Sequence, residues 1–264
     1  MKIYSSLSPF KEQVFGGSIR SFAQIADKLK IAGLDGIEIN SIIFEKNYQN
    51  LLPFNFNFRG IDYSMVTLHS NYLDFNLGSA NSFTRNAGIE QVVNEYEFAE
   101  NNGVRIVTIH PGRVKGIPRE AAMGLLWNSL SDIYKRIEQS ETKLCIENMD
   151  NKQEKLCNRL SEIEKTLSKF PDLGLTVDFA HLGLNNENIG MFIEKFKSRI
   201  CHIHISGVKK GYRHGDVSLS RSEIDFMPFL TSFVRKNITA VIENSRWDDV
   251  IESKKVLEKL GNKG

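Results

Sequence analysis

The amino-acid sequence predicts an α/β protein built as a (β/α)8 barrel (TIM barrel), and three observations carry this prediction. Short apolar runs rich in valine and isoleucine alternate with longer segments of helical periodicity, which is typical of βα units around a parallel sheet. Eight such runs can be counted. The 264 residues, 41% hydrophobic and 25% charged, fit one barrel of roughly 250 residues. We therefore expect a single domain over residues 1–264.

The eight expected strands are the apolar runs, taken in chain order. Strands of a parallel sheet are buried on both faces, so nearly continuous apolar runs are their signature. A doubly wound open sheet is the alternative fold, but no glycine-rich dinucleotide or phosphate motif supports it. The runs are Lys2–Ser6, Gly36–Asn40, Met65–His69, Arg105–His110, Lys143–Glu147, Gly174–Asp178, Ile200–Ile205 and Thr239–Glu243.

Helix start and stop signals separate these runs. Ser18 precedes an amphipathic stripe that Gly33 follows, so we expect a helix between a serine cap and a glycine stop. Pro118 suits the first turn of another helix. Ser220 and Glu223 have the spacing of a capping box and predict a further helix start.

Composition excludes several classes of protein. Lys and Arg total 34 against 32 Asp and Glu, a net charge of +2 that is too small for a dedicated nucleic-acid binder. Cys145, Cys157 and Cys201 are odd in number and lack metal-type spacing, so we expect reduced thiols. The chain starts with a strand-like segment and holds no secretory or membrane-spanning stretch, so we expect a cytoplasmic protein.

The longest irregular stretch is Ser41–Ser64, which contains five aromatic residues: Phe44, Tyr48, Phe54, Phe56 and Phe58. Loops of this length are often functional, so a lid or a subunit contact is one interpretation. Packing of these aromatic side chains over the barrel rim is the interpretation we favour.

Polar residues end most of the predicted strands, where barrels of this kind place their active sites. Carboxylates at one level on three strands would repel one another in a low-dielectric barrel mouth unless cations or protons neutralised them. A bound metal ion is the simplest solution. The carboxylates are Glu147, Asp178 and Glu243, and the chain's six histidines, His69, His110, His181, His202, His204 and His214, lie in the same strand ends and loops.

Imidazole and carboxylate are ligands of Zn²⁺, Mn²⁺, Fe²⁺ and Co²⁺, and we expect one to three divalent ions, with zinc or manganese favoured. His69 and His110 could hold a second ion bridged by Glu147. His181 and His214 could complete a third site or bind substrate. The best-supported ion uses the groups of the last four strands, namely Glu147, Asp178, His204 and Glu243.

Other polar residues near the strand ends have more than one interpretation. His202 lies two residues before His204, one layer deeper, where a core or supporting role is expected. Glu38 could support the site or serve the fold alone. The asparagines that end strands could contact a polar ligand or satisfy loop backbone; they are Asn40, Asn148 and Asn244.

Six segments together resemble the xylose-isomerase-like barrel superfamily, which contains sugar isomerases and epimerases and the endonuclease IV type of abasic-site nuclease. The resemblance covers the whole chain and is more specific for the superfamily than for one activity. The segments are His69-Ser70-Asn71-Tyr72-Leu73 with Asn76-Leu77, Thr108-Ile109-His110-Pro111-Gly112, Glu147-Asn148, Asp178-Phe179-Ala180-His181, His204-Ile205-Ser206 and Glu243-Asn244.

The resemblance to the isomerases implies one divalent ion on Glu147, Asp178, His204 and Glu243. It makes Glu147 and Glu243 the catalytic pair that moves a proton next to a metal-polarised carbonyl, and it assigns His181 to a substrate hydroxyl. A small sugar or sugar phosphate is the expected partner, with no membrane. A phosphate could be bound by loop cations that could equally be solvated surface charge: Lys209, Lys210, Arg213 and Arg246.

The resemblance to the nucleases is the alternative, and it implies three zinc ions, phosphodiester hydrolysis and a nucleic-acid partner. Eight of the nine ligand positions match, and Tyr72-Leu73 fall where the nucleases insert side chains into the duplex. Tyr212 stands where the pattern requires an aspartate, which weakens the third zinc site unless Asp216 or water replaces it. The stretch Gly215–Ser220 also departs from the pattern. A non-catalytic metal-binding barrel is a further interpretation.

Overall fold

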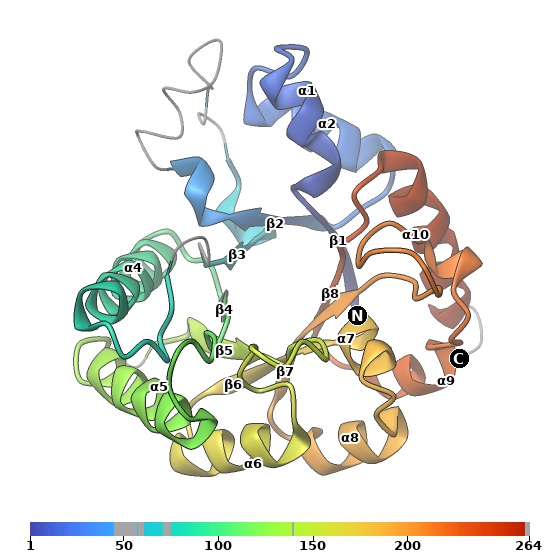
Figure 1. The fold of residues 1–264 in the computed structure, drawn as a ribbon. Coiled ribbons are helices and arrows are strands. Elements are labelled where there is room, and N and C mark those ends of the chain that lie inside the picture. Colours follow the sequence, from blue (N-terminus) through green and yellow to red (C-terminus); the bar gives the residue numbers. More distant parts are fainter. Residues whose placement is uncertain (45–56, 58–60, 71–74, 139, 262–264) are drawn as a thin grey trace. The chain divides into compact units, whose positions relative to one another are not determined.

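A computed structural model describes residues 1–44, 57, 61–70, 75–138 and 140–261. The strands form a closed parallel barrel in the order β1 to β8, which confirms the predicted fold class (Figure 1). They are β1 (Lys2–Ser6), β2 (Gly36–Asn40), β3 (Val66–His69), β4 (Ile106–Ile109), β5 (Lys143–Glu147), β6 (Gly174–Asp178), β7 (Ile200–Ile205) and β8 (Thr239–Ile242).

Helices connect the strands in the described part of the chain. Short 3-10 turns accompany them at Ser8–Phe10, Ser41–Phe44, Tyr63–Met65, Leu219–Arg221 and Thr231–Phe233. The α-helices are α1 (Lys11–Phe15), α2 (Phe22–Ile31), α4 (Ser82–Asn101), α5 (Arg119–Tyr134), α6 (Leu160–Lys169), α7 (Phe179–Leu184), α8 (Ile189–Phe196), α9 (Met227–Leu230) and α10 (Trp247–Gly261).

The chain divides into two compact units, and each is described by itself. The first unit comprises Met1–Thr67 and Ile203–Gly264, and the second comprises Leu68–His202. The expectation of one domain over residues 1–264 stays a prediction.

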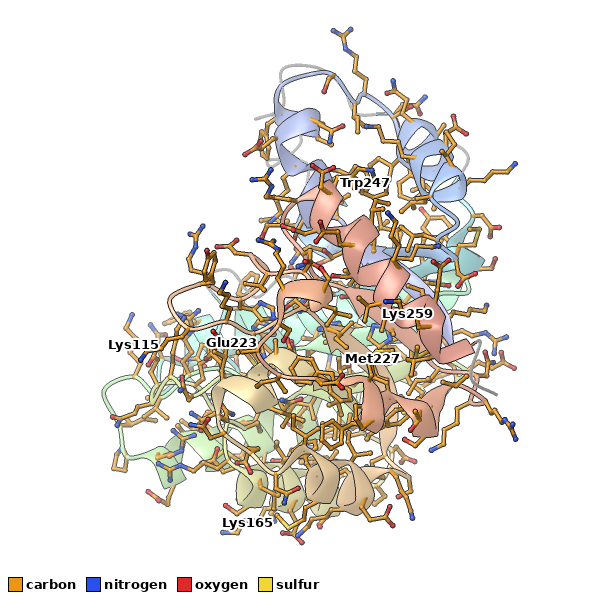
Figure 2. The ribbon with its side chains drawn as sticks, turned by 90° about the vertical axis from the view of Figure 1, so that its right-hand side faces the viewer. Lys115, Lys165, Glu223, Met227, Trp247 and Lys259 are labelled. Atoms are coloured by element: carbon orange, nitrogen blue, oxygen red, sulfur yellow. The ribbon has the colours of Figure 1, made fainter. Side chains whose placement is uncertain are left out.

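In the first unit, β1 pairs with β2 and β8, with Tyr4 opposite Gly36 and Val241. Trp247 and Lys259 mark the beginning and the last turn of α10 in Figure 2. The Trp247 ring lies 5.1 Å from that of Phe10, a fully buried residue. These contacts bury the apolar face of α10 against the N-terminal segment.

In the second unit, β4, β5 and β6 pair in register, so that Thr108 lies opposite Cys145 and Cys145 opposite Gly174. Helices α4, α5 and α6 lie along one side of these strands (Figure 1). Leu126 and Leu130 of α5 are fully buried, as an amphipathic helix against a sheet requires. This packing fixes the ends of β4, β5 and β6, where the polar residues of interest lie.

Two predicted helix signals are wrong. The helix expected to begin after Ser18 begins at Phe22, because Ser21 and Gln24 form the capping box instead. Ser220 and Glu223 cap no helix, since Leu219–Arg221 is a 3-10 turn. The Ser220 hydroxyl donates to Glu252, and Glu223 accepts the backbone N–H of Lys210. Local spacing cannot reveal such distant partners.

The strand boundaries differ slightly from those predicted. Met65 belongs to a 3-10 turn, Arg105 and His110 flank β4, and Glu243 follows β8. Most of Ser41–Ser64, and the pair Tyr72-Leu73, lie outside the described residues, so the expectations for them stay predictions. Among the described residues, no helix has the length and apolar character needed to span a membrane.

Candidate metal centre

The second unit gathers three imidazoles around one carboxylate. Glu147 ends β5 and is almost fully buried. Its Oε2 lies 3.4 Å from Nε2 of His69 and 3.0 Å from Nε2 of His110, while its Oε1 lies 3.6 Å from Nδ1 of His181. The rings of His69 and His110 meet edge to face with their centroids 4.9 Å apart. These four residues therefore form one polar cluster at the ends of their strands.

Backbone carbonyls orient two of these histidines. Nδ1 of His69 lies 2.9 Å from the carbonyl oxygen of Ser70, and Nδ1 of His181 lies 2.8 Å from that of Asn148. A carbonyl only accepts, so each Nδ1 donates its N–H and the opposite nitrogen, Nε2, keeps a lone pair. A ring nitrogen whose lone pair is oriented in this way can bind a metal ion.

The environment of His110 also favours the neutral ring. Burial lowers the pKa of His110 to about 4, although the neighbouring Glu147 carboxylate acts in the opposite direction. The imidazole is therefore neutral at pH 7. Neutral imidazole is the form that binds metal.

Asp178 ends β6 and is fully buried beside this cluster. Its Oδ1 accepts the backbone N–H of His181 and so caps α7, and its Oδ2 lies 3.3 Å from Nδ1 of the same histidine. One carboxylate therefore both starts the helix and fixes the position of His181. The strand end and the cap place a second buried acid next to Glu147.

The donor set of the second unit fits a transition-metal ion. The ligand atoms of His69, His110 and Glu147 all lie within 4.8 Å of one another. Ligand atoms that each lie roughly 2.0–2.2 Å from one ion are separated by about 3–4.4 Å, and the distances of 3.4 Å and 3.0 Å from Oε2 of Glu147 to the two histidines fall in this range. The predicted grouping of His69 and His110 with Glu147 is thus present in the structure.

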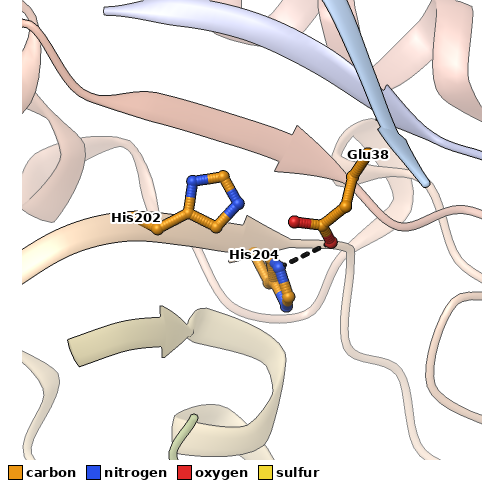
Figure 3. Close-up of side chains that lie close together, drawn as sticks. All are labelled: Glu38, His202 and His204. Carbon is orange, nitrogen blue, oxygen red and sulfur yellow. Dashed lines mark ion pairs between the residues drawn. The ribbon is translucent and has the colours of Figure 1, made fainter. Parts of the chain in front are cut away.

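The first unit reverses the arrangement and places one imidazole between two carboxylates. His204 of β7 is fully buried. Its Nε2 lies 2.8 Å from Oε1 of Glu38 on β2, the ion pair drawn in Figure 3, and its Nδ1 lies 3.3 Å from Oε1 of Glu243. Thr67 donates its hydroxyl to the other Glu38 oxygen at 3.1 Å.

This arrangement indicates where a cation is needed. If Nε2 of His204 donates to Glu38, its Nδ1 presents a lone pair to a carboxylate oxygen of Glu243, and two acceptors then face each other. A metal ion or a proton between them removes the repulsion. Glu38 thus lies against one ring nitrogen of His204, as backbone carbonyls lie against one ring nitrogen of His69 and of His181.

The remaining histidines have different surroundings. Nε2 of His214 lies 3.5 Å from Oε2 of Glu243, and the side chains of both are partly exposed. His202 is fully buried on β7, two residues before His204 (Figure 3), which fits the core or supporting role expected for it. The predicted ligands therefore fall into two sets: His69, His110, Glu147, Asp178 and His181 in the second unit, and His204, His214 and Glu243 in the first.

The loop cations predicted to contact a phosphate are exposed. Lys209, Arg213 and Arg246 all lie on the surface of the first unit, and the Arg213 side chain is 90% exposed and pairs with Asp216 at 3.1 Å. The ammonium of Lys209 lies 5.4 Å above the ring of Tyr212. Asp216 is thus engaged with an arginine.

The asparagines at strand ends serve the backbone. Asn148 exchanges two hydrogen bonds with the backbone of Asp178, and Asn244 donates to the carbonyls of Gly215 and Val217. Asn40 accepts the N–H of Ile42. These contacts support the interpretation in which the asparagines satisfy loop backbone.

Sequence reasoning missed two residues of the second unit. Lys155 and Asp150 form an ion pair at 3.1 Å in the loop after β5, and the side chain of Lys155 is only 15% exposed. Both follow the strand end by several residues, so a search restricted to strand ends passes over them. The only sequence signal was a lysine in the polar loop within eight residues after Glu147. Lysines are too common in such loops for this signal to single out one residue.

Comparisons with known proteins bear on the family. A profile described as xylose isomerase-like TIM barrel matches residues 26–259. The uncharacterized protein MJ1188 of Methanocaldococcus jannaschii is 28% identical over 172 residues, covering 64% of this chain and 62% of that protein. The probable endonuclease 4 of Sulfurihydrogenibium sp. is 24% identical over 161 residues, covering 61% of this chain and 50% of that protein. The chain thus spans less than two thirds of either relative.

Solved structures share the fold at low sequence identity. A D-tagatose 3-epimerase-like protein has a TM-score of 0.77 and 19% identity, covering 99% of this chain and 97% of that one. An IolI protein with a bound zinc atom has a TM-score of 0.76 and 15% identity, covering 100% and 99%. At these identities the likeness establishes the fold alone.

Proposed function

The chain belongs to the xylose isomerase-like TIM barrel family, and on this premise we propose that it is a divalent-metal-dependent isomerase or epimerase of a sugar or sugar phosphate. The observation that carries the proposal is the set of buried acids and imidazoles at the carboxyl ends of strands. Buried carboxylates are costly to retain for stability alone. Epimerases among the structural neighbours support the choice of reaction.

We place one ion on the groups that end the last four strands of the closed order, namely Glu147, Asp178, His204 and Glu243. Their donors suit Zn²⁺ or Mn²⁺, and the zinc-bound IolI neighbour supports such a site. A divalent ion bound there would polarise the oxygens of a substrate carbonyl and its neighbouring hydroxyl.

The two glutamates have the roles of acid and base. Removal of a proton from the carbon beside a carbonyl requires a carboxylate on one face of the substrate, and its return requires a protonated partner. Glu147 is nearly fully buried, whereas the Glu243 side chain is 17% exposed, so their environments differ. In this proposal His181 binds a substrate hydroxyl, and Lys209, Arg213 and Arg246 are contacts for a phosphate.

A zinc-dependent abasic-site nuclease is the second candidate. The cluster of His69 and His110 on Glu147 favours it, because it supplies ligands beyond the four assigned to the first ion. The endonuclease 4 relatives support it as well. Position 212 opposes it, since Tyr212 is 51% exposed and offers no carboxylate, and Asp216 is paired with Arg213. We therefore rank it second.

Two measurements on the same preparation separate the candidates. Elemental analysis gives the number of ions per chain, and an isomerase is expected to hold about one tightly bound ion. It should also exchange a substrate C–H proton with deuterated solvent in a panel of free and phosphorylated ketoses. Cleavage of an abasic-site duplex with close to three zinc ions would replace this proposal by the nuclease, and no exchange across the panel would contradict it.

A further inference from the structure

A small hollow opens beside His110 in the second unit. Apolar side chains such as Phe75 and Met149 form part of its wall. Two cationic residues, Arg113 and Lys155, line it together with His110. The proposed function gives neither of these two cations a role.

The backbone sets Arg113 and Lys155 directly opposite each other. They form an isolated antiparallel bridge, with hydrogen bonds from Val114 N to Glu154 O at 2.6 Å and from Leu156 N to Gly112 O at 3.1 Å. In a pair flanked by hydrogen bonds in this way, opposite Cα atoms lie about 4.5 Å apart and both side chains leave on the same face. Two like charges so placed repel each other unless an anion compensates them.

Both partners of the bridge are held rigidly. Asn76 accepts the N–H of Arg113 at 2.8 Å and donates to its carbonyl at 2.9 Å. Gly112, at φ 101°, lies so close that a Cβ there would be 2.4 Å from the same Asn76 side chain, so the motif requires glycine. The guanidinium of Arg119 donates to the carbonyl of Lys155 at 2.8 Å. A rigid pair loses little conformational entropy when it binds a ligand.

The nearby acids compensate this pair only in part. Asp150 contacts Lys155 at 3.1 Å and Lys152 at 3.7 Å. Burial acts to raise the pKa of Asp150, but Lys155, with smaller contributions from His181 and Lys152, holds the pKa below its ordinary value. Within the described residues, no carboxylate pairs with the guanidinium of Arg113. Arg113 is exposed, so water solvates its guanidinium and its charge is accessible to a ligand.

We propose that Arg113 and Lys155 form a binding site for the oxyanion group, a phosphate or a carboxylate, of a small molecule that reaches the hollow beside His110. Arginine offers a planar fork of donors and lysine a point charge, the combination that suits such groups. Arg113 also lines an adjoining outer hollow, together with Glu154 and with Lys115, whose loop is marked in Figure 2. Because the carboxylate of Glu154 disfavours an anion there, we place the anion in the inner hollow. In assigning this anion to the substrate, the inference rests on the proposed function.

The site also offers a different anchor for a charged substrate from the exposed loop cations. A buried cation is screened less by water and salt than one that is 90% exposed, as Arg213 is. We therefore expect Lys155, with 15% of its side chain exposed, to contribute more to anion binding than Arg213.

Calorimetric titration of the full chain with inorganic phosphate, and separately with acetate, tests the site. We expect saturable binding of at least one anion, weakened about tenfold or more by Lys155→Met and by Arg113→Met. The matched control is Lys152→Met: Lys152 also contacts Asp150, but its side chain is 62% exposed. This control should change the affinity less than threefold.

Phosphate binding assigns a phosphate ester to the site, and acetate binding assigns a carboxylate. Absence of saturable binding of either anion, or equal weakening by Lys152→Met, overturns the proposal. Because Lys155→Met leaves Asp150 without its main partner, the double variant Asp150→Asn/Lys155→Met is measured as well, and Lys155→Arg should restore binding. Elemental analysis of each sample reports the metal separately, so loss of anion binding at unchanged metal content affects this inference alone.

Discussion

The candidate ligands of the two units form two halves that use the same side-chain types in opposite arrangements. In the second unit the Glu147 carboxylate lies among three imidazoles, whereas in the first unit the His204 imidazole lies between the carboxylates of Glu38 and Glu243. One half is rich in neutral ligands and the other in anionic ligands. The proposed ion would use both kinds: neutral donors to complete its coordination and negative charge to balance its own.

The two halves also differ in how their histidines are oriented. Backbone carbonyls hold His69 and His181, and no side-chain substitution removes a carbonyl. A buried carboxylate holds His204, and a single substitution can neutralise it. The first unit should therefore be the half whose metal affinity is more easily lost by mutation away from the ligands.

The largest effect is expected from Glu147→Gln, which removes the charge shared by the three histidines. Because Glu147 is both a proposed ligand and a proposed acid–base group, exchange of the substrate proton should slow about 10³-fold. Measurement of deuterium exchange by NMR, with elemental analysis of the same sample, checks this. The fold should persist, as circular dichroism would report.

Glu141→Gln is the matched control for that experiment. Glu141 precedes β5 just as Glu147 ends it, but its side chain is 81% exposed and pairs with Arg105 on the surface. Its substitution should leave exchange within twofold of the wild type. A Glu147→Gln enzyme that keeps a tenth or more of its activity would contradict the role given to this carboxylate.

The second effect, in order of size, concerns Glu38→Gln. The glutamine amide can still contact Nε2 of His204, but it lacks the negative charge that favours one tautomer of the His204 ring. Metal affinity should therefore fall about 10- to 100-fold. Competition with a chromogenic chelator measures the affinity directly. If affinity stays within twofold, His204 is oriented by something other than Glu38, and the contrast between the two halves fails.

Much of the fold follows from the sequence because each strand carries a local signal. Runs such as Lys143–Glu147 and Gly174–Asp178 appear as predicted, residue for residue, since strands buried on both faces are uniformly apolar. The helix starts were harder to predict. Ser18 and Ser21 are equally good caps by type, but only Ser21 is followed three residues later by a glutamine, Gln24, which is the capping-box spacing that the prediction overlooked.

The site was predictable where function coincides with a strand end. His69 and Glu147 could be paired because the closed order of parallel strands brings their ends to one edge. Glu38 lies inside a strand, so its pairing with His204 depends on three-dimensional proximity across the sheet. Lys155 lies in a loop, and its burial arises from the hydrogen bonds of Arg119 and from the bridge to Arg113, none of which is visible as a local pattern.

Tyr212→Asp sharpens the comparison by adding an acid near the anionic half. The tyrosine ring is half exposed beneath Lys209, so the substitution should cost little stability. If His181 and His214 descend from a third metal site, elemental analysis after zinc loading should show up to one additional ion per chain. Unchanged stoichiometry would indicate that these histidines serve substrate binding, and Tyr212→Asn controls for loss of the ring.

The smallest effect is expected from Thr67→Val, which removes the hydrogen bond to the second Glu38 oxygen and keeps the side-chain shape. A hydrogen bond to a buried charged group contributes about 1.5–3 kcal/mol, so the free energy of unfolding should fall by about that amount in denaturant titrations. Metal affinity should fall only a few-fold, because the carboxylate remains. Thr142→Val removes a buried hydroxyl that donates to the Val104 carbonyl and should lower stability without changing metal affinity. Equal loss of affinity in both variants would mean that general destabilisation, and not the support of His204 by Glu38, governs the metal site of the first unit.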